Sequence, residues 1–134
     1  GEPRLAVAAG VGELRARLDD APVVLVGVGS GANLAVARAA AVPAEVAGLV
    51  LLSPLPELGG VRITEPWAKL RAKPALVITT ADDTKGIAGA KLQADHEQTA
   101  FTLLQYDSAA HGRELFAEHP QVTGRILDWV QRLP

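Results

Sequence analysis

Four short apolar segments, separated by stretches of helical character, constrain the fold of this chain more than any other feature. They are rich in β-branched residues, are bounded by Gly, Pro or Asp, and occupy residues 22–27, 47–53, 74–80 and 100–106. Segments of this kind predict β-strands. The first three are almost continuously apolar, which is typical of strands covered on both faces. The pattern predicts an α/β fold, a three-layer sandwich with a mostly parallel sheet of about four strands.

The intervening segments predict helices that cover this sheet. We expect them at about residues 11–19, 31–41, 65–72, 86–97 and 120–132. The alanine-rich helix 31–41 should be the most buried, because its small side chains permit close approach on several sides. Helix 120–132 should dock on the sheet through an apolar stripe, formed by Val122, Ile126, Trp129, Val130 and Leu133.

Length and composition bound what the chain can be. Its 134 residues suit a single domain, here taken as residues 1–134 and as truncated, and 49% of them are hydrophobic with very few aromatic rings. The net charge of −2 and the absence of long charge runs argue against nucleic acid as a partner. No segment predicts a membrane span or a signal peptide, so we expect a soluble protein, cytoplasmic or periplasmic. Because it begins at Gly1 without methionine, we expect a processed product or part of a longer chain.

A glycine-rich turn follows the first predicted strand. Gly27, Val28, Gly29, Ser30 and Gly31 lie between that strand and the alanine-rich helix. A strand, a sharp glycine turn and a helix start are also the parts of the nucleophile elbow G-x-S-x-G, whose central residue is lifted above the sheet in a strained conformation. In this chain the central position is a glycine.

The chain resembles the α/β-hydrolase family. The resemblance is carried by VVLVGVGSGANLA at 23–35, LVLLSP at 49–54, VITTADD at 77–83 and AAHG at 109–112. Family members order their triad as nucleophile, acid and histidine, and the matching positions are Gly29, Asp83 and His111. The resemblance covers nearly the whole chain but only the C-terminal half of a family member, without the strands before the elbow or the loop that supplies an oxyanion amide. The chain is also similar to uncharacterised bacterial hydrolase-like proteins whose elbow reads G-H-G-T-G.

The resemblance implies that the nucleophile position is vacant. Glycine has no oxygen with which to attack an ester, and it relieves about 1–3 kcal/mol of backbone strain at an elbow. We therefore expect a catalytically silent hydrolase-like domain that binds a ligand or a protein. Ser30, one residue late, should cap the following helix. The backbone N–H groups of Ser30 and Gly31 could still bind a small anionic ligand.

Two later positions complete the family pattern. Asp83, or Asp82 if the register differs by one, would orient an imidazole, although a plain turn residue is the competing interpretation. His111 matches the general base, although a lone loop histidine is commonly a surface or capping residue. His96 and His119 are too far apart for a metal motif, so we interpret both as solvated and expect no metal and no cofactor.

Two other functions compete with the silent domain. An active esterase-type hydrolase could use Ser30, or a water activated by His111 and Asp83. A nucleotide-binding domain is suggested by the spacing of Gly27, Gly29 and Ala32, but the next strand ends in Ser53 and Pro54 instead of the acidic residue that such sites use for ribose.

Loops 54–64 and 81–86 follow the carboxyl ends of strands and are the expected location of any binding site. If the first predicted strand or another one lies at an edge of the sheet, it could pair with a second copy of the chain or with a missing N-terminal segment. A homodimer is therefore a candidate assembly.

Overall fold

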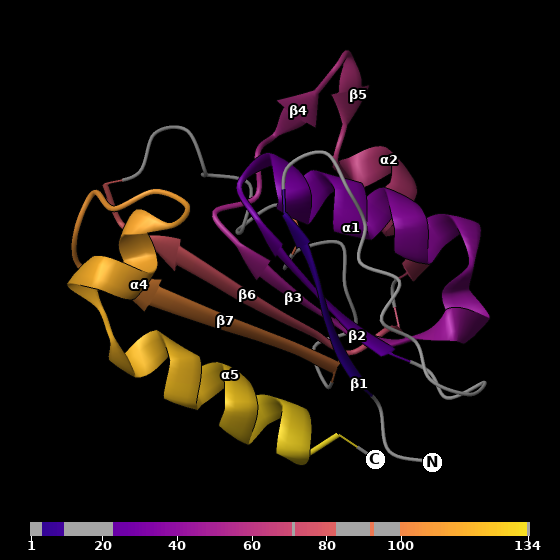
Figure 1. The fold of residues 1–134 in the computed structure, drawn as a ribbon. Coiled ribbons are helices and arrows are strands. Elements are labelled where there is room, and N and C mark those ends of the chain that lie inside the picture. The colour runs from indigo at the N-terminus through magenta and orange to yellow at the C-terminus, as the bar shows by residue number, and fades with distance from the viewer. Residues whose placement is uncertain (1–3, 10–22, 71, 83–91, 93–99, 134) are drawn as a thin grey trace.

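A computed structural model describes residues 4–9, 23–70, 72–82, 92 and 100–133. It contains a five-stranded sheet in the order β1-β2-β3-β6-β7, in which every neighbouring pair is parallel (Figure 1). The strands are β1 (Arg4–Ala9), β2 (Val23–Val28), β3 (Val46–Leu52), β6 (Ala75–Thr80) and β7 (Phe101–Tyr106). The four predicted strands are therefore confirmed within one residue or so at each end.

The fifth strand, β1, was not predicted. It precedes the glycine turn and pairs with β2 from Arg4↔Val23 to Ala9↔Val28. One expectation needs correction as a result, because one strand before the elbow does have a counterpart in this chain. The first predicted strand, β2, lies between β1 and β3, so of the two options for an edge strand the alternative, another parallel strand, applies. Within the described part of the sheet, the outermost strands are β1 and β7.

Helix α1 (Ser30–Ala41) covers one face of the sheet and corresponds to the predicted helix 31–41. Its inward side is formed by alanines that are fully buried, together with a buried valine, and comprises Ala32, Ala35, Val36 and Ala39. These small side chains let the helix lie close to β2 and β3. The helix also contacts α2 (Thr64–Trp67) and β4 (Glu57–Leu58), so it packs closely on more than one side, and it has more buried residues than any other described helix, as predicted. On its exposed side, Leu34 is 39% accessible.

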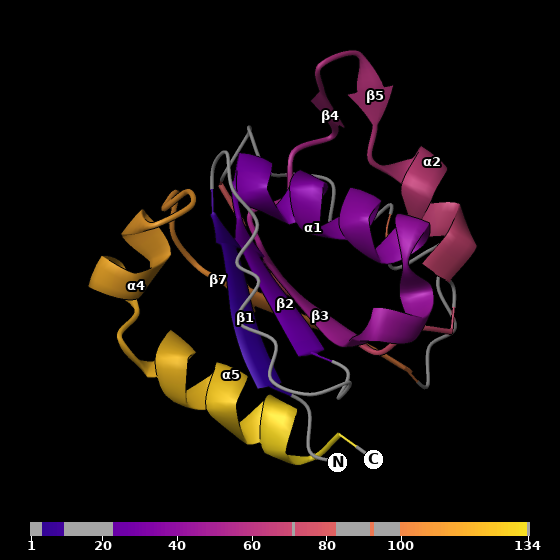
Figure 2. The ribbon, with the colours of Figure 1, turned by 45° about the vertical axis from the view of Figure 1, so that its right-hand side comes forward.

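Helices α4 (Glu114–Glu118) and α5 (Gln121–Gln131) lie on the other face, so α1 and α5 sandwich the sheet (Figures 1 and 2). The stripe predicted for helix 120–132 is present. Val122 and Ile126 are buried against β2, β3 and β6, and Trp129, Val130 and Leu133 are partly buried against the same cluster. The α/β three-layer architecture is therefore confirmed. No helix within the described residues is long and apolar enough to cross a membrane.

The segment predicted as helix 65–72 is shorter than expected. Helix α2 (Thr64–Trp67) makes a single turn and continues as the 3-10 turn η2 (Ala68–Leu70). Trp67 is fully buried, donates its indole N–H to the carbonyl of Leu92 at 3.0 Å, and meets Phe101 edge-on. The predicted helices 11–19 and 86–97 lie outside the described residues, apart from Leu92.

A small hairpin interrupts the segment expected to be a loop at 54–64. It consists of β4 (Glu57–Leu58) and β5 (Val61–Arg62), which pair antiparallel across Gly59 and Gly60. Both glycines have positive φ, as tight hairpin turns require. The hairpin stands out from the body of the molecule beyond α1 (Figure 1).

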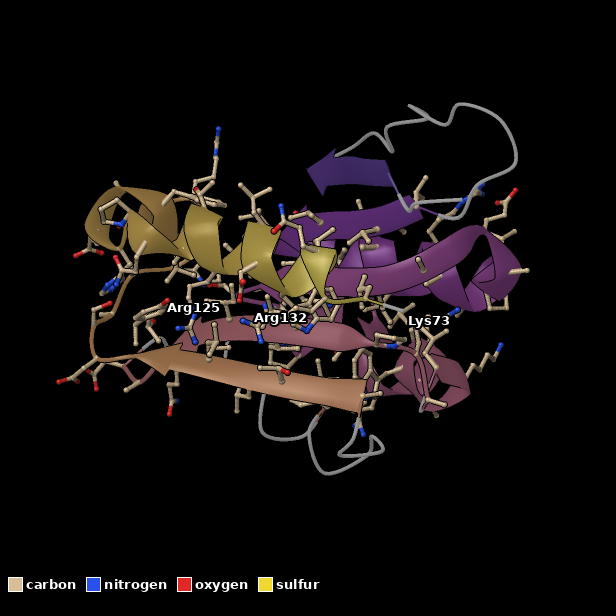
Figure 3. All side chains as sticks on the ribbon, turned by 90° about the horizontal axis from the view of Figure 1, so that it is seen from below. Lys73, Arg125 and Arg132 are labelled. Atoms are coloured by element: carbon tan, nitrogen blue, oxygen red, sulfur yellow. The ribbon has the colours of Figure 1, made fainter. Side chains whose placement is uncertain are left out.

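The view from below shows three basic side chains, of which Arg125 and Arg132 are exposed and Lys73 is partly buried (Figure 3). Arg125 and Arg132 extend from the side of α5 that faces β6 and β7, and Arg132 pairs with Asp128 one turn earlier at 3.1 Å. Lys73 lies farther along and donates to the carbonyls of Pro43 and Val46, so it closes the 3-10 turn η1 (Pro43–Glu45). Burial lowers the pKa of the Lys73 ammonium.

Candidate functional site

A sharp turn joins β2 to α1 and forms the elbow predicted from the sequence. Gly29 stands between Val28, the last residue of β2, and Ser30, the first residue of α1, with φ 59° and ψ −121°. Its N–H donates to the carbonyl of Leu52 on β3 at 2.8 Å, and its own carbonyl accepts from the N–H of Ala32 at 3.0 Å. Positive φ is readily adopted by glycine and strained for other residues. The turn therefore has elbow geometry, and glycine fits it without strain.

Gly27 explains how the strand and helix approach so closely. A Cβ atom on Gly27 would lie 2.5 Å from the Cα atom of Ala32, and the carbonyl oxygen of Gly31 would be closer still. Both are backbone atoms and cannot rotate away. The first glycine of the motif is therefore required by the packing of α1 on β2, as the elbow pattern predicts.

His111 faces the centre of this turn. A Cβ atom on Gly29 would lie 3.8 Å from Nε2 of His111, which is ordinary van der Waals contact. The histidine is partly buried and comes from the loop after β7, 82 residues further along the chain. The structure thus brings Gly29 and His111 together, at the carboxyl ends of β2 and β7.

The acidic position is only partly described. Asp83 lies outside the described residues, so its placement relative to His111 stays a prediction. Asp82 is exposed, and its backbone N–H donates to the carbonyl of Ser108 at 3.0 Å. This bond ties the loop after β6 to the loop after β7, which is the loop that carries His111.

Ser30 does not cap α1, contrary to the expectation from sequence. It is the first residue of the helix, the N-cap position is taken by Gly29, and no side-chain capping bond is found there. A capping side chain must precede the helix, and Gly29 has none to offer. The N–H groups of Ser30 and Gly31 lie in the first turn, where helix geometry supplies no intrahelical acceptor.

Two side chains that the sequence analysis did not single out as site residues hold the loop that carries His111. The hydroxyl of Thr80, at the end of β6, donates to the carbonyl of Ala110 at 2.7 Å. The hydroxyl of Ser53, just after β3, accepts from the N–H of Gly112 at 3.0 Å. Both residues are buried. Their bonds span 30 and 59 residues along the chain, so no local sequence pattern could have pointed to them.

His119, which the sequence predicted to be solvated, is partly buried and makes specific contacts. Its ring stacks on Tyr106 with centroids 4.6 Å apart and planes 20° apart, and its Nε2 is 3.0 Å from the hydroxyl of Ser108. The expectation failed because the contact joins the end of β7 to the end of α4, which are separated in sequence. His96 lies outside the described residues. Among the described residues, no group of three His, Cys, Asp or Glu side chains could hold a metal ion.

The connection after β3 is fixed to α1. Asn33 of α1 is buried, and its side-chain amide both donates to the carbonyl of Leu55 at 2.8 Å and accepts from the N–H of Leu55 at 2.9 Å. This reciprocal pair substitutes for a backbone pairing and holds the start of segment 54–64 beside the elbow. The second loop expected to carry the site, 81–86, is described only at residues 81 and 82.

Comparisons with known proteins agree with this architecture. No family model matches the sequence, and no curated protein matches it. Several solved structures do. A candidate non-heme bromoperoxidase from Mycobacterium tuberculosis is 19% identical with a TM-score of 0.68, over 85% of this chain and 68% of that one. The structure described as LipS and LipT, two metagenome-derived lipolytic enzymes, is 15% identical with a TM-score of 0.67, over 83% of this chain and 65% of that one. A Pyrococcus furiosus esterase is 17% identical with a TM-score of 0.67, over 84% of this chain and 54% of that one.

These likenesses define the fold. The chain resembles the α/β-hydrolase superfamily and has its fold, as the elbow and the order of its motifs predicted. It spans between about half and about two thirds of the length of these structures. At identities below one fifth, the likeness concerns architecture alone.

Proposed function

We propose that residues 1–134 form a single truncated α/β-hydrolase-like domain that is catalytically silent in ester hydrolysis and binds a ligand or a protein instead. One observation carries this proposal. The residue whose side-chain position lies opposite Nε2 of His111 is Gly29, which has no hydroxyl. Acyl transfer through a serine needs that hydroxyl within about 2.6–3.2 Å of the imidazole nitrogen.

Ser30 is a poor substitute for the missing nucleophile. It belongs to the first turn of α1, one residue beyond the apex of the elbow. Successive residues of a helix point in directions about 100° apart, so a shift of one position re-aims the side chain. The comparison structures described as esterase or lipolytic enzymes share the fold, and this chain carries glycine at its elbow apex.

What the elbow retains is suited to binding. The N–H groups of Ser30 and Gly31 are at the positive end of α1, and helix N-termini favour carboxylates and phosphates. Nε2 of His111 faces the same space, and we propose Asp83 as the residue that orients its ring. The ligand expected from this chemistry is a small anion, held at the place where a hydrolase would hold the acyl group of its substrate.

Labelling with a fluorophosphonate probe tests the silence of the site. The wild-type protein should remain unlabelled, and Ser30→Ala should be indistinguishable from it. Gly29→Ser supplies a hydroxyl opposite His111 and is the matched variant for gain of labelling. Stoichiometric labelling of the wild-type protein that disappears in Ser30→Ala would overturn the proposal in favour of an active hydrolase.

Binding is tested by NMR titration of the backbone amides with acetate and with inorganic phosphate. We expect the amide signals of Ser30 and Gly31 to shift saturably. The amide of Gln121 is the internal control, because it too begins a helix, which lies on the other face of the sheet from α1. Equal shifts at both helix starts would contradict a specific site. Shifts with NAD or ATP alone would instead favour the nucleotide-binding alternative.

A protein partner is the second arm of the proposal. Within the described sheet, β1 and β7 are the outermost strands, and unpaired strand edges can be continued by another chain. We propose a homodimer or pairing with an additional N-terminal segment through such an edge. Light scattering across a concentration series checks the dimer, and a monomer at the highest concentration would remove it.

A further inference from the structure

We infer that Ser53 is a positioning residue, which fixes the imidazole of His111 above the glycine of the elbow. The inference rests on the proposed function, since positioning matters only if the space above Gly29 is the binding site. Ser53 is not itself a ligand-contacting group, because it is fully buried and its hydroxyl contacts the main chain of the loop that carries His111.

The backbone of Ser53 has an unusual conformation. Its φ of 50° makes it the only non-glycine residue with positive φ among those described. Such conformations are uncommon for residues with a Cβ atom, and they persist where the surrounding structure holds them in place, often at functional sites. Here the unusual turn directs the chain away from β3 just as it passes the elbow.

In this conformation the hydroxyl of Ser53 contacts the loop that carries His111. It accepts a hydrogen bond from the N–H of Gly112 at 3.0 Å, in a buried environment. Gly112 directly follows His111, so the bond fixes the backbone on one side of the histidine. Removing the hydroxyl would leave a buried N–H without its acceptor, which buried donors rarely tolerate.

The same segment also holds the elbow. The carbonyl of Leu52 accepts from the N–H of Gly29 at 2.8 Å, while the N–H of Ser53 donates to the carbonyl of Ile78 on β6 at 2.9 Å. Two consecutive residues, Leu52 and Ser53, therefore contact the elbow on one side and the histidine loop on the other. The separation of Gly29 and His111 is set across this short segment.

Thr80 supplies a second anchor from the neighbouring strand. Its hydroxyl donates to the carbonyl of Ala110, so the residues before and after His111 are both tied to the ends of buried strands. Groups supported in this way by rigid elements are held in one orientation. In a hydrolase the serine hydroxyl can also bind the imidazole, whereas Gly29 offers no side chain, so in this chain these anchors carry more of that role.

Proton NMR cross-relaxation tests the inference directly. In the wild-type protein we expect a cross-peak between the Hα protons of Gly29 and the ring protons of His111. Ser53→Ala and Ser53→Gly both remove the hydroxyl, and the glycine variant adopts φ of 50° without strain. Both variants should lose this cross-peak or most of its intensity, and the amide proton of Gly112 should exchange faster with solvent.

Thr79→Val is the matched control, because Thr79 is a buried hydroxyl residue on β6 whose side chain alternates to the other face of the strand. It should leave the cross-peak unchanged. A cross-peak that persists in both Ser53 variants, or that is absent from the wild-type protein, overturns the inference.

A second pair of variants covers the case in which the Ser53 variants do not fold. Thr80→Val should weaken the cross-peak and Thr80→Ser, which keeps the hydroxyl, should restore it; an undiminished cross-peak in Thr80→Val overturns the inference. These readings do not depend on catalysis. Fluorophosphonate labelling of the wild-type protein would refute the silent domain while leaving the position of His111 to be read as before.

Discussion

The elbow and the loop that carries His111 face one another, yet they are held in place by different means. The elbow depends on close backbone packing and on glycines, and Gly27 leaves no room even for a methyl group. The histidine loop depends on side-chain hydroxyls that reach it from β3 and β6. The elbow is therefore determined by a short stretch of sequence, whereas the position of the histidine loop is determined by the assembled sheet.

The largest effect on stability should come from Gly27→Ala, which disrupts the packing of α1 on β2 at the elbow. The new Cβ atom would overlap backbone atoms of Gly31 and Ala32, so strand and helix must separate. We expect a loss of about 3 kcal/mol in the free energy of unfolding, measured by urea denaturation. Gly124→Ala in α5, where nothing lies within 4 Å of the new atom, is the control and should be neutral or stabilising. A loss below that of an ordinary surface change would mean that the elbow is loosely packed.

Thr80→Val should have the next largest effect and strikes the histidine loop. The carbonyl of Ala110 would lose its buried donor, which costs about 1–3 kcal/mol. Hydrogen exchange should show the change concentrated in residues 108–112 while the amides of α1 stay protected. Equal loss of protection in α1 would contradict the view that the two halves are held separately.

Gly29→Ala should have a smaller effect, since the space for its methyl group already exists. Its Cβ atom would meet Nε2 of His111 at 3.8 Å, so the penalty comes from positive φ alone, and we expect it at the lower end of about 1–3 kcal/mol. Thermal unfolding measures it against wild type. A destabilisation as large as that of Gly27→Ala would show that the histidine loop lies closer to the elbow than this distance.

Ser30→Ala should have the smallest effect, within about 0.5 kcal/mol of zero, because Ser30 makes no capping bond and alanine favours helix. Urea denaturation beside the wild-type protein is the measurement. A loss of about 1 kcal/mol would instead be the signature of a lost N-cap and would restore the original interpretation of this residue.

The parts that the sequence predicted are those written in consecutive residues. Apolar runs predict the strands at 22–27, 47–53, 74–80 and 100–106, and the glycines predict the elbow. Strand β1 escaped notice because RLAVAA contains one β-branched residue among alanines, so it has little intrinsic preference for strand. Its pairing with β2 is what makes it a strand.

The parts that the sequence did not predict depend on contacts between distant segments. The sequence identifies Ser53 only as the end of a strand that lacks an acidic residue, because its bond to Gly112 forms only when β3 and the last loop are assembled. The contacts of His119 are likewise absent from any local pattern, because its partners, Tyr106 and Ser108, precede α4 in the sequence. Ser30 failed by a single position, since the helix begins one residue earlier than expected.

The tip of the β4–β5 hairpin is a position at which additional residues could be inserted. A Cβ atom added to either glycine of this tip would meet nothing within 4 Å, and the reciprocal Asn33–Leu55 pair anchors the base of the hairpin to α1. Additional residues spliced into the tip would project into solvent without disturbing the sheet, since exposed loop tips tolerate insertion well. Because the base lies next to the elbow, such an extension would rise over the same end of the sheet, so a reporter peptide grafted there could sense what arrives at the site.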